Sequence, residues 1–246
     1  LKNHLVATLG EFVGTTMFLF FAFAGTQAAS ILSAQVQLST DSTDAATALL
    51  GIQKLVYISL SFGFSLMVNV WIFFRISGGL FNPAVTLALL LTRAIPPLRA
   101  PFLLLAQLAG GIAASALVLA LFPAPTYVNT SLSTSEVKGV FIEGFLTAEL
   151  VFTILMLAKE KHKATFMAPV GIGLALFIAE LVGVQWTGGS LNPARSFGPA
   201  VVTGSFKSEH WVYWVGPIAG SLIAVSFYVI IKGLEYEMVN PGQDAD

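Results

Sequence analysis

The chain contains no cysteine and few charged side chains, and both shortages narrow what it can do. Without cysteine there is no disulfide framework and no thiolate metal site. The three histidines, His4, His162 and His210, are dispersed and show no spacing typical of metal ligands. Since the sequence also lacks a nucleophile, metal-cluster or cofactor motif, we expect neither an enzyme nor a bound cofactor or metal. A net charge of −1 gives no reason to expect a nucleic-acid partner.

Apolar sequence, by contrast, is abundant. Hydrophobic residues make up 56 % of the chain, charged residues 10 %, and the mean hydropathy is +0.82, far from an average soluble domain. Apolar runs long enough to cross a bilayer, about 20 residues each, lie near 9–29, 50–74, 98–122, 141–158, 165–185 and 211–232. A buried bundle in a soluble protein would need polar faces that these runs lack. The composition therefore predicts an integral, multi-pass membrane protein in a lipid bilayer.

Positive charges are distributed unevenly between the two sides of these spans. With the N-terminus in the cytoplasm, twice as many Lys and Arg residues fall inside as outside, as the positive-inside rule expects. The inside set is Lys2, Arg75, Arg93, Arg99, Lys159, Lys161, Lys163 and Lys232, and the outside set is Lys54, Lys138, Arg195 and Lys207. Both termini are then cytoplasmic, with 233–246 as a tail, and residues 30–50 form a long outside loop. We expect the plasma membrane as the location.

The tripeptide Asn-Pro-Ala occurs twice, at Asn82-Pro83-Ala84 and at Asn192-Pro193-Ala194. Each copy follows a short polar or glycine-bearing stretch inside apolar sequence. Because Asn is a good N-cap and Pro is favoured at the first helical position, each copy predicts the start of a half-helix. While the Asn oxygen caps the helix, its NH2 group stays free to donate a hydrogen bond.

The two copies belong to an internal repeat. Gly110 and Gly220 each lie 28 residues after the Asn of one copy. The spacing Glu-x-x-x-Thr opens the first half at Glu11 and the second half at Glu149. Three spans in each half is an odd number, so the second half must cross the membrane in the opposite sense.

This inverted repeat predicts one channel domain over 1–246, with halves at about 5–122 and 140–232. Inverted repeats place broken helices near the bilayer midplane. The two half-helices then meet with their positive N-terminal ends together, which disfavours a cation in a poorly screened setting. The Asn amides remain able to donate to a neutral oxygen, so the pattern predicts a pore for a small uncharged solute.

Three sequence runs carry a family resemblance: SGGLFNPAVT at 77–86, TGGSLNPARSFGPA at 187–200 and HWVYWVGP at 210–217. Together they resemble the aquaporins of the major intrinsic protein family, and the resemblance covers essentially the whole chain. It implies an all-α membrane fold with six transmembrane helices plus two re-entrant half-helices, one pore in each subunit, and a homotetramer.

The resemblance also implies a selectivity filter of four residues, which spacing assigns to Phe62, Glu180, Gly189 and Arg195. Arg195 follows the second motif directly, and Phe62 lies 20 residues before the Asn of the first. Relatives that select water usually have His where this chain has Glu180. Two interpretations stay open: Glu180 accepts a hydrogen bond from Arg195 and narrows the passage, or it turns away to cap a loop and, with Gly189, leaves a wider filter for larger neutral solutes.

Helical spacing supplies candidates for an apolar pore wall. Leu66 follows Phe62 by four residues and Leu176 precedes Glu180 by four, while Phe18 and Met156 each lie seven residues after a repeated Glu. Ordinary packing is the alternative for all four. The resemblance places Glu11 and Glu149 behind the re-entrant loops, where they accept backbone N–H groups, with Gln107 as a further partner. A proton relay is the minor alternative.

The resemblance favours a passive water channel that excludes protons and ions. Glycerol-conducting relatives typically carry Asp after the Arg and a basic residue four positions later, where this chain has Ser196 and Ala200; Tyr213 and Trp214 also resemble the water-selective branch. A broader channel for hydrogen peroxide or glycerol is the alternative, because of Glu180 and Gly189. A secondary transporter is a remote alternative, since it would need ion-coupling acids and more spans.

Overall fold

The computed structural model describes residues 1–39 and 44–242, and all regular structure in these residues is helical. Six long helices are apolar enough to cross a membrane. They are α1 (Lys2–Ser39), α2 (Asp44–Phe73), α4 (Ala100–Leu121), α5 (Glu136–Ile154), α6 (Ala168–Thr187) and α8 (Val212–Gly233). Two shorter helices, α3 (Pro83–Leu91) and α7 (Pro193–Thr203), begin at the Asn-Pro-Ala copies. The predicted fold class is therefore confirmed.

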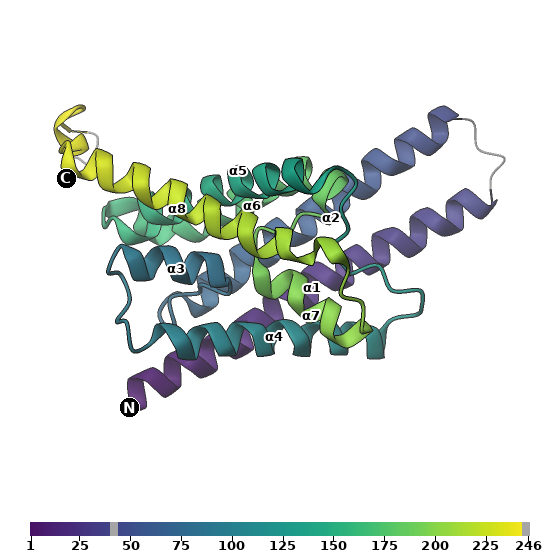
Figure 1. Ribbon diagram of the computed structural model, residues 1–246, viewed down its shortest axis with the longest axis horizontal. Helices are drawn as coiled ribbons and strands as arrows, with labels where there is room; N and C mark the ends of the chain where they lie inside the picture. Colours follow the sequence, from purple (N-terminus) through teal and green to yellow (C-terminus); the bar gives the residue numbers. More distant parts are fainter. Residues whose placement is uncertain (40–43, 243–246) are drawn as a thin grey trace.

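Short turns extend three of the long helices. A π-helical turn, Leu155–Lys159, continues α5, and the 3-10 turns Lys163–Met167 and Ser208–Trp211 precede α6 and α8. A last 3-10 turn, Tyr236–Met238, follows α8. Both termini lie at the same end of the molecule (Figure 1).

The long outside loop expected over 30–50 is wrong where the structure describes it. Residues 30–39 continue α1 and 44–50 begin α2, while 40–43 lie outside the described residues. No Gly or Pro occurs between Gly25 and Gly51, so polar residues there have nothing to interrupt a helix. At about 1.5 Å per residue, the 38 residues of α1 exceed a bilayer core of about 30 Å. Figure 1 shows α1 and α2 extending past the other helices.

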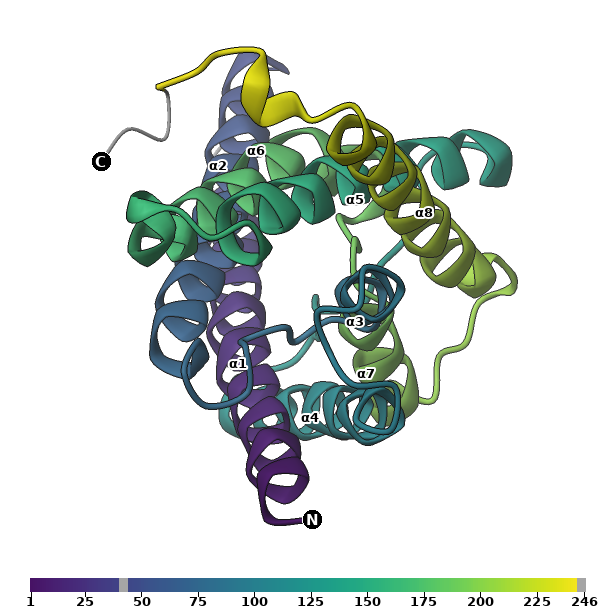
Figure 2. The ribbon, with the colours of Figure 1, turned by 90° about the vertical axis from the view of Figure 1, so that its left-hand side faces the viewer.

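The two halves are arranged as equivalent units. In the first half α1 packs against α2 and α4, and in the second half α5 packs against α6 and α8, with α2 against α6 joining the halves. Each half-helix packs across to the other half as well as within its own: α3 contacts both α8 and α4, and α7 contacts both α4 and α8. Figure 2 shows α3 and α7 among the long helices.

Gly110 and Gly220 mark the same contact in each half. A Cβ on Gly110 would lie 2.8 Å from the Phe12 carbonyl and 2.9 Å from Thr15 Cβ. On Gly220 it would lie 2.3 Å from the Gly144 carbonyl and 2.9 Å from Thr147 Cβ. Both glycines therefore let two long helices cross closely. Because Gly110 lies against Thr15 and Gly220 against Thr147, these two threonines are equivalent positions, and they define how the sequences of the two halves align.

Candidate pore and selectivity filter

Both half-helices begin with the predicted caps. Asn82 is extended (φ −149°, ψ 121°), and its Oδ1 accepts the Ala84 N–H at 2.8 Å. Asn192 has nearly the same conformation, and its Oδ1 accepts the Ala194 N–H at 2.9 Å. Pro83 occupies the first position of α3, where its missing N–H costs nothing, as its counterpart does in α7.

The two caps are joined crosswise. Asn82 Nδ2 donates to the Leu191 carbonyl at 2.8 Å, and Asn192 Nδ2 donates to the Phe81 carbonyl at 2.9 Å. Phe81 and Leu191 both have positive φ, 54° and 50°, a conformation that non-glycine residues rarely adopt. Each amide thus spends one N–H on the opposite loop, which the sequence did not predict, and keeps the other. Both Asn side chains line one lumen.

Glu11 holds the first re-entrant loop. Its carboxylate accepts the Ser77 hydroxyl at 2.6 Å and the backbone N–H groups of Leu80 and Phe81 at 3.0 and 2.7 Å. Gln107 Nε2 donates to the same carboxylate at 2.7 Å, as expected. These donors belong to irregular backbone that has no helical partner, so the carboxylate replaces the bonds a helix would make.

Glu143, and not Glu149, does the same for the second loop. Glu143 accepts Thr187 Oγ1 at 2.5 Å and the N–H groups of Ser190 and Leu191 at 2.9 and 2.6 Å. Glu149 is exposed on the outer surface of α5, so the prediction that it supports the loop is wrong. The spacing Glu-x-x-x-Thr occurs at Glu143 and again six residues later at Glu149, and the prediction rests on the second occurrence. The contact of Gly220 with Thr147 identifies the first.

Arg195 lies in the lumen wall with its guanidinium fixed by backbone carbonyls. Nε donates to the Gly189 carbonyl at 2.9 Å, Nη1 to Val128 at 2.7 Å and Nη2 to Gly188 at 3.0 Å. Its Cζ lies 5.0 Å from the centre of the Phe62 ring, close enough for a cation–π contact. The backbone of the second loop therefore sets the position of this charge. Phe62 and Arg195 line the same lumen.

Glu180 also lines this lumen, but neither interpretation from the sequence describes it. Its side chain is fully buried, and neither carboxylate oxygen has a hydrogen-bond partner among the described residues. Because the Arg195 bonds go to carbonyls, the expected hydrogen bond from Arg195 to Glu180 is absent. The carboxyl does not cap a loop either.

Gly189 provides the space that the Glu180 carboxyl occupies. A Cβ at position 189 would lie 1.9 Å from Glu180 Oε2, and the backbone there has φ +61°, which favours glycine. The missing side chain therefore does not leave the wider filter that was one of the two expectations. The carboxyl of Glu180 and the missing side chain of Gly189 therefore fit together in volume.

Most of the remaining lumen wall is apolar, and Ser190 adds a polar side chain. Phe18, Leu66 and Leu176 line it as predicted, whereas Met156 does not: it lies partly buried in the π-helical turn, packed against the core. The lining residues of α5 are Leu150 and Ile154. Met156 was predicted by counting seven residues from Glu149. Counting seven residues from Glu143 leads to Leu150, which does line the lumen. The free volume of the lumen is about 20 Å³, room for about one or two water molecules.

Each end of the lumen opens into a wider hollow. One, of about 350 Å³, is lined by Lys54, Tyr127 and Arg195 among others. The other, of about 340 Å³, lies at the end that carries both termini and is lined by Lys159, Lys161 and Arg99 among others.

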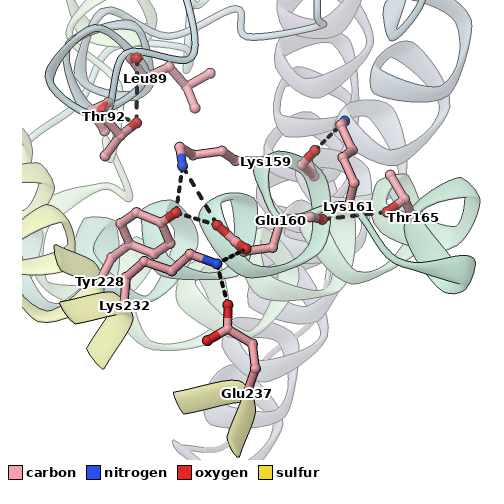
Figure 3. Close-up of polar contacts among 11 residues, drawn as sticks. Leu89, Thr92, Lys159, Glu160, Lys161, Thr165, Tyr228, Lys232 and Glu237 are labelled. Carbon is pink, nitrogen blue, oxygen red and sulfur yellow. Dashed lines mark hydrogen bonds and ion pairs between the residues drawn. The ribbon is translucent and has the colours of Figure 1, made fainter. Parts of the chain in front are cut away.

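A cluster of charged side chains borders this second hollow (Figure 3). Glu160 accepts hydrogen bonds from Tyr228 and from Lys232, the latter at 2.8 Å, and Lys232 also pairs with Glu237. Lys159 lies 3.6 Å from the Glu160 carboxylate. Burial by itself would raise the pKa of Glu160, but the hydrogen bonds from Lys232 and Tyr228 outweigh it and lower the pKa. The cluster ties the end of α5 to the end of α8.

Comparison with known proteins agrees with this architecture. The family model described as "Major intrinsic protein" matches residues 2–228. Aquaporin-5 of Botryotinia fuckeliana (strain B05.10) is 70 % identical over 100 % of this chain and 45 % of its own length. Probable aquaporin-5 of Gibberella zeae (strain ATCC MYA-4620 / CBS 123657 / FGSC 9075 / NRRL 31084 / PH-1) is 67 % identical, again over 45 % of its length. The chain thus spans a little under half the length of these two curated relatives.

More complete coverage comes from other relatives. Aquaporin-8 of Botryotinia fuckeliana is 50 % identical over 100 % of this chain and 74 % of its own length. The crystal structure of the aquaglyceroporin from Plasmodium falciparum shares the fold, with a TM-score of 0.76 and 20 % identity over 95 % of this chain and 99 % of that one. Its fold, the family match and the paired half-helix caps agree: this chain belongs to the major intrinsic protein family, whose aquaporin members are membrane channels and not enzymes.

Proposed function

We propose that the chain is a passive water channel whose pore excludes protons and other cations. The observation that carries the proposal is the meeting of two half-helix N-termini in one lumen, each capped by an Asn with an N–H group to spare. Each N-terminus carries roughly half an elementary positive charge. Their sum repels a cation, while the two amides donate to the oxygen of a passing water molecule.

The apolar wall supports rapid passage. Between the Asn pair and Arg195, the lumen offers mainly hydrocarbon surface from Phe18, Leu66 and Leu176. A water molecule there finds few hydrogen-bond partners and is not held. Conduction requires that solute binding stays weak enough for release, so this wall favours high flux.

Water is favoured over glycerol by the volume of the filter. The lumen volume of about 20 Å³ holds about one or two water molecules, less than glycerol needs, and the Glu180 carboxyl fills the space left by Gly189. The Plasmodium falciparum protein is described as an aquaglyceroporin, but at 20 % identity that likeness concerns the fold alone. We therefore propose water as the principal solute and no substantial glycerol flux.

Stopped-flow light scattering on proteoliposomes tests this function. Vesicles shrunk by an impermeant sugar should lose water rapidly compared with protein-free vesicles, and glycerol should not re-enter on the same timescale. Flow linear in the osmotic gradient distinguishes a channel from a secondary transporter, whose flux saturates. Shrinkage no faster than in protein-free vesicles would refute the proposal.

We further propose a homotetramer in the plasma membrane with cytoplasmic termini. Glu149 supports assembly, because a carboxyl on the outer face of a span is costly in contact with lipid and less so against a second copy. The positive side chains Lys159, Lys161 and Arg99 at the end with both termini support the orientation. Native mass spectrometry should detect four copies, and monomers at every detergent concentration would contradict the assembly.

A further inference from the structure

Two positively charged side chains share the hollow at the end of the lumen away from both termini. The Lys54 hollow, a cavity of about 350 Å³, is lined by Lys54 of α2 and Arg195 of α7, and no carboxyl group of the described residues lines it. Ser30, Thr126 and Ser131 add hydroxyl groups to its wall. The volume lies within the range of small-molecule sites, about 300–1,000 Å³. The Lys54 hollow is therefore a cationic cavity large enough for a small ligand.

The ammonium group of Lys54 lacks a negatively charged partner. The side chain is partly buried, and within 1–39 and 44–242 neither an ion pair nor a hydrogen bond joins its Nζ to another group. Its contact is with the ring of Tyr127, whose centre lies 5.6 Å from Nζ, a cation–π distance. The ring leaves the three N–H donors of the ammonium without an acceptor. Because burying an unpaired charge costs free energy, an anion in the hollow would stabilise Lys54.

Arg195 brings a second charge that the protein does not neutralise on this side. The three bonds that hold its guanidinium go to backbone carbonyls, which carry no formal charge. They use three of its five N–H groups and leave two to donate. The Glu180 carboxyl lines the lumen and is not among the residues that line the Lys54 hollow. The hollow thus holds two positive charges with donors to spare.

One segment of the chain, 123–128, positions both charges. The Gln27 side chain fixes this segment, because its Nε2 donates to two proline carbonyls at 2.7 Å and its Oε1 accepts the Tyr127 N–H at 2.9 Å. The Tyr127 ring contacts Lys54, and the carbonyl of the next residue accepts Arg195 Nη1 at 2.7 Å. Consecutive residues of a fixed segment therefore hold the two cations, which are positioned before any ligand arrives.

The chemistry of the two cations selects the class of ligand. An oxyanion carries its charge on several acceptor oxygens, so it can accept from an ammonium and a guanidinium together. The planar guanidinium matches carboxylate and phosphate groups, and hydrogen bonds between charged partners are stronger than neutral ones. Cavities lined by charges of one sign also concentrate ions of the opposite sign.

We propose that the Lys54 hollow is a binding site for a small dissolved oxyanion, a carboxylate or a phosphate, held between Lys54 and Arg195. Since Arg195 also lines the lumen, the bound anion covers that entrance and slows water flow. The site itself goes beyond the proposed function, whereas the slowing of flow rests on it.

The first test measures binding with inorganic phosphate as the probe, from the broadening of its ³¹P NMR line by the detergent-purified protein. Lys54→Gln removes the charge and one charge-assisted hydrogen bond, so the affinity should fall about tenfold or more. Lys138→Gln, the same change on an exposed residue of α5, should leave the affinity unchanged. Lys161→Gln, the same change in the hollow at the opposite end of the lumen, should also leave it unchanged.

The second test measures water flow in proteoliposomes by light scattering, in phosphate and in chloride of equal ionic strength. Phosphate should slow wild-type flow relative to chloride. In Lys54→Gln, half-maximal slowing should need about ten times more phosphate, while flow in chloride stays that of the wild type.

The outcomes separate the site from the channel. Equal phosphate affinity in wild type and Lys54→Gln would overturn the site, as would a loss of affinity in Lys161→Gln with none in Lys54→Gln. Phosphate binding that depends on Lys54 but leaves water flow unchanged would support the site and refute the slowing of flow. Absence of wild-type water flow in chloride would refute the channel function, and the NMR titration would still decide the site.

Discussion

Glu143→Gln tests the assignment of loop support more sharply than any other substitution in this chain. Glu143 Oε1 accepts Thr187 Oγ1 and the Ser190 N–H, and Oε2 accepts the Leu191 N–H. A glutamine has one carbonyl oxygen, which can keep the first pair. Its NH2 group must then face the Leu191 N–H, and two donors cannot bond each other.

The magnitude follows from the bonds that are lost. One hydrogen bond to a charged group contributes about 1.5–3 kcal/mol, and the buried N–H left unpaired costs about 1–3 kcal/mol more. The substitution should therefore lower the free energy of unfolding by about 2.5–6 kcal/mol. For a chain of this length, each kcal/mol corresponds to a fall in Tm of about 2–4 °C, so Tm should fall by at least about 5 °C.

Thermal unfolding of the detergent-purified protein, followed by circular dichroism, measures this change. Glu149→Gln is the matched control, because it makes the same chemical change six residues along the same helix on an exposed side chain. Its Tm should stay close to that of the wild type, as for most exposed substitutions. If Glu149→Gln lowered Tm as much as Glu143→Gln, the frame of the second repeat assigned from the structure would be incorrect.

Three further predictions concern conduction and pH. Asn82→Asp keeps the oxygen that caps α3 but removes the N–H donor, so water flow should fall about tenfold and proton leak should rise in a vesicle with a pH-sensitive dye; unchanged flow would contradict the role of the amide. Glu160→Gln should lower Tm at neutral pH and make no difference in strongly acid buffer. The reason is that the pKa of Glu160 is lowered, so its stabilisation is present above the usual pKa of a free Glu and is lost as pH falls through the lowered value. An equal effect on Tm at both pH values would count against the Lys232 contact. Mercuric ion should leave water flow unchanged, since the chain has no thiol; rapid block by a low concentration would mean that metal binds elsewhere in the pore.

Much of the fold can be predicted from the sequence, because the patterns that predict it involve residues close together in the chain. Each Asn-Pro-Ala cap depends on a side chain and the N–H group two residues later, and six apolar runs need only length and composition. The lining position Phe18 follows from helical spacing to Glu11, and Leu66 and Leu176 follow from their spacing to Phe62 and Glu180. These features require no knowledge of how distant segments meet.

The errors arise where a distant contact decides between equal local patterns. Glu143 and Glu149 share the same spacing to a Thr, and only the close approach of Gly220 to Thr147 distinguishes them. Met156 was misplaced for the same reason. The orientation of Glu180 depends on the empty space at Gly189, which lies nine residues later and on the other side of a turn. The helical continuation of α1 contradicts the predicted loop because polar residues are compatible with a helix where no Gly or Pro interrupts it.

The crosswise bonds between the two caps bear on the order in which the protein can be assembled during its synthesis. The Asn82 amide donates to a carbonyl 109 residues further along the chain, and the Phe81 carbonyl accepts from an amide 111 residues away. Until the second repeat has been synthesised, the first re-entrant loop can bond to Glu11 but lacks the Asn192 amide that donates to its Phe81 carbonyl. The lumen takes lining residues from both halves, so it cannot be complete before the second repeat is inserted.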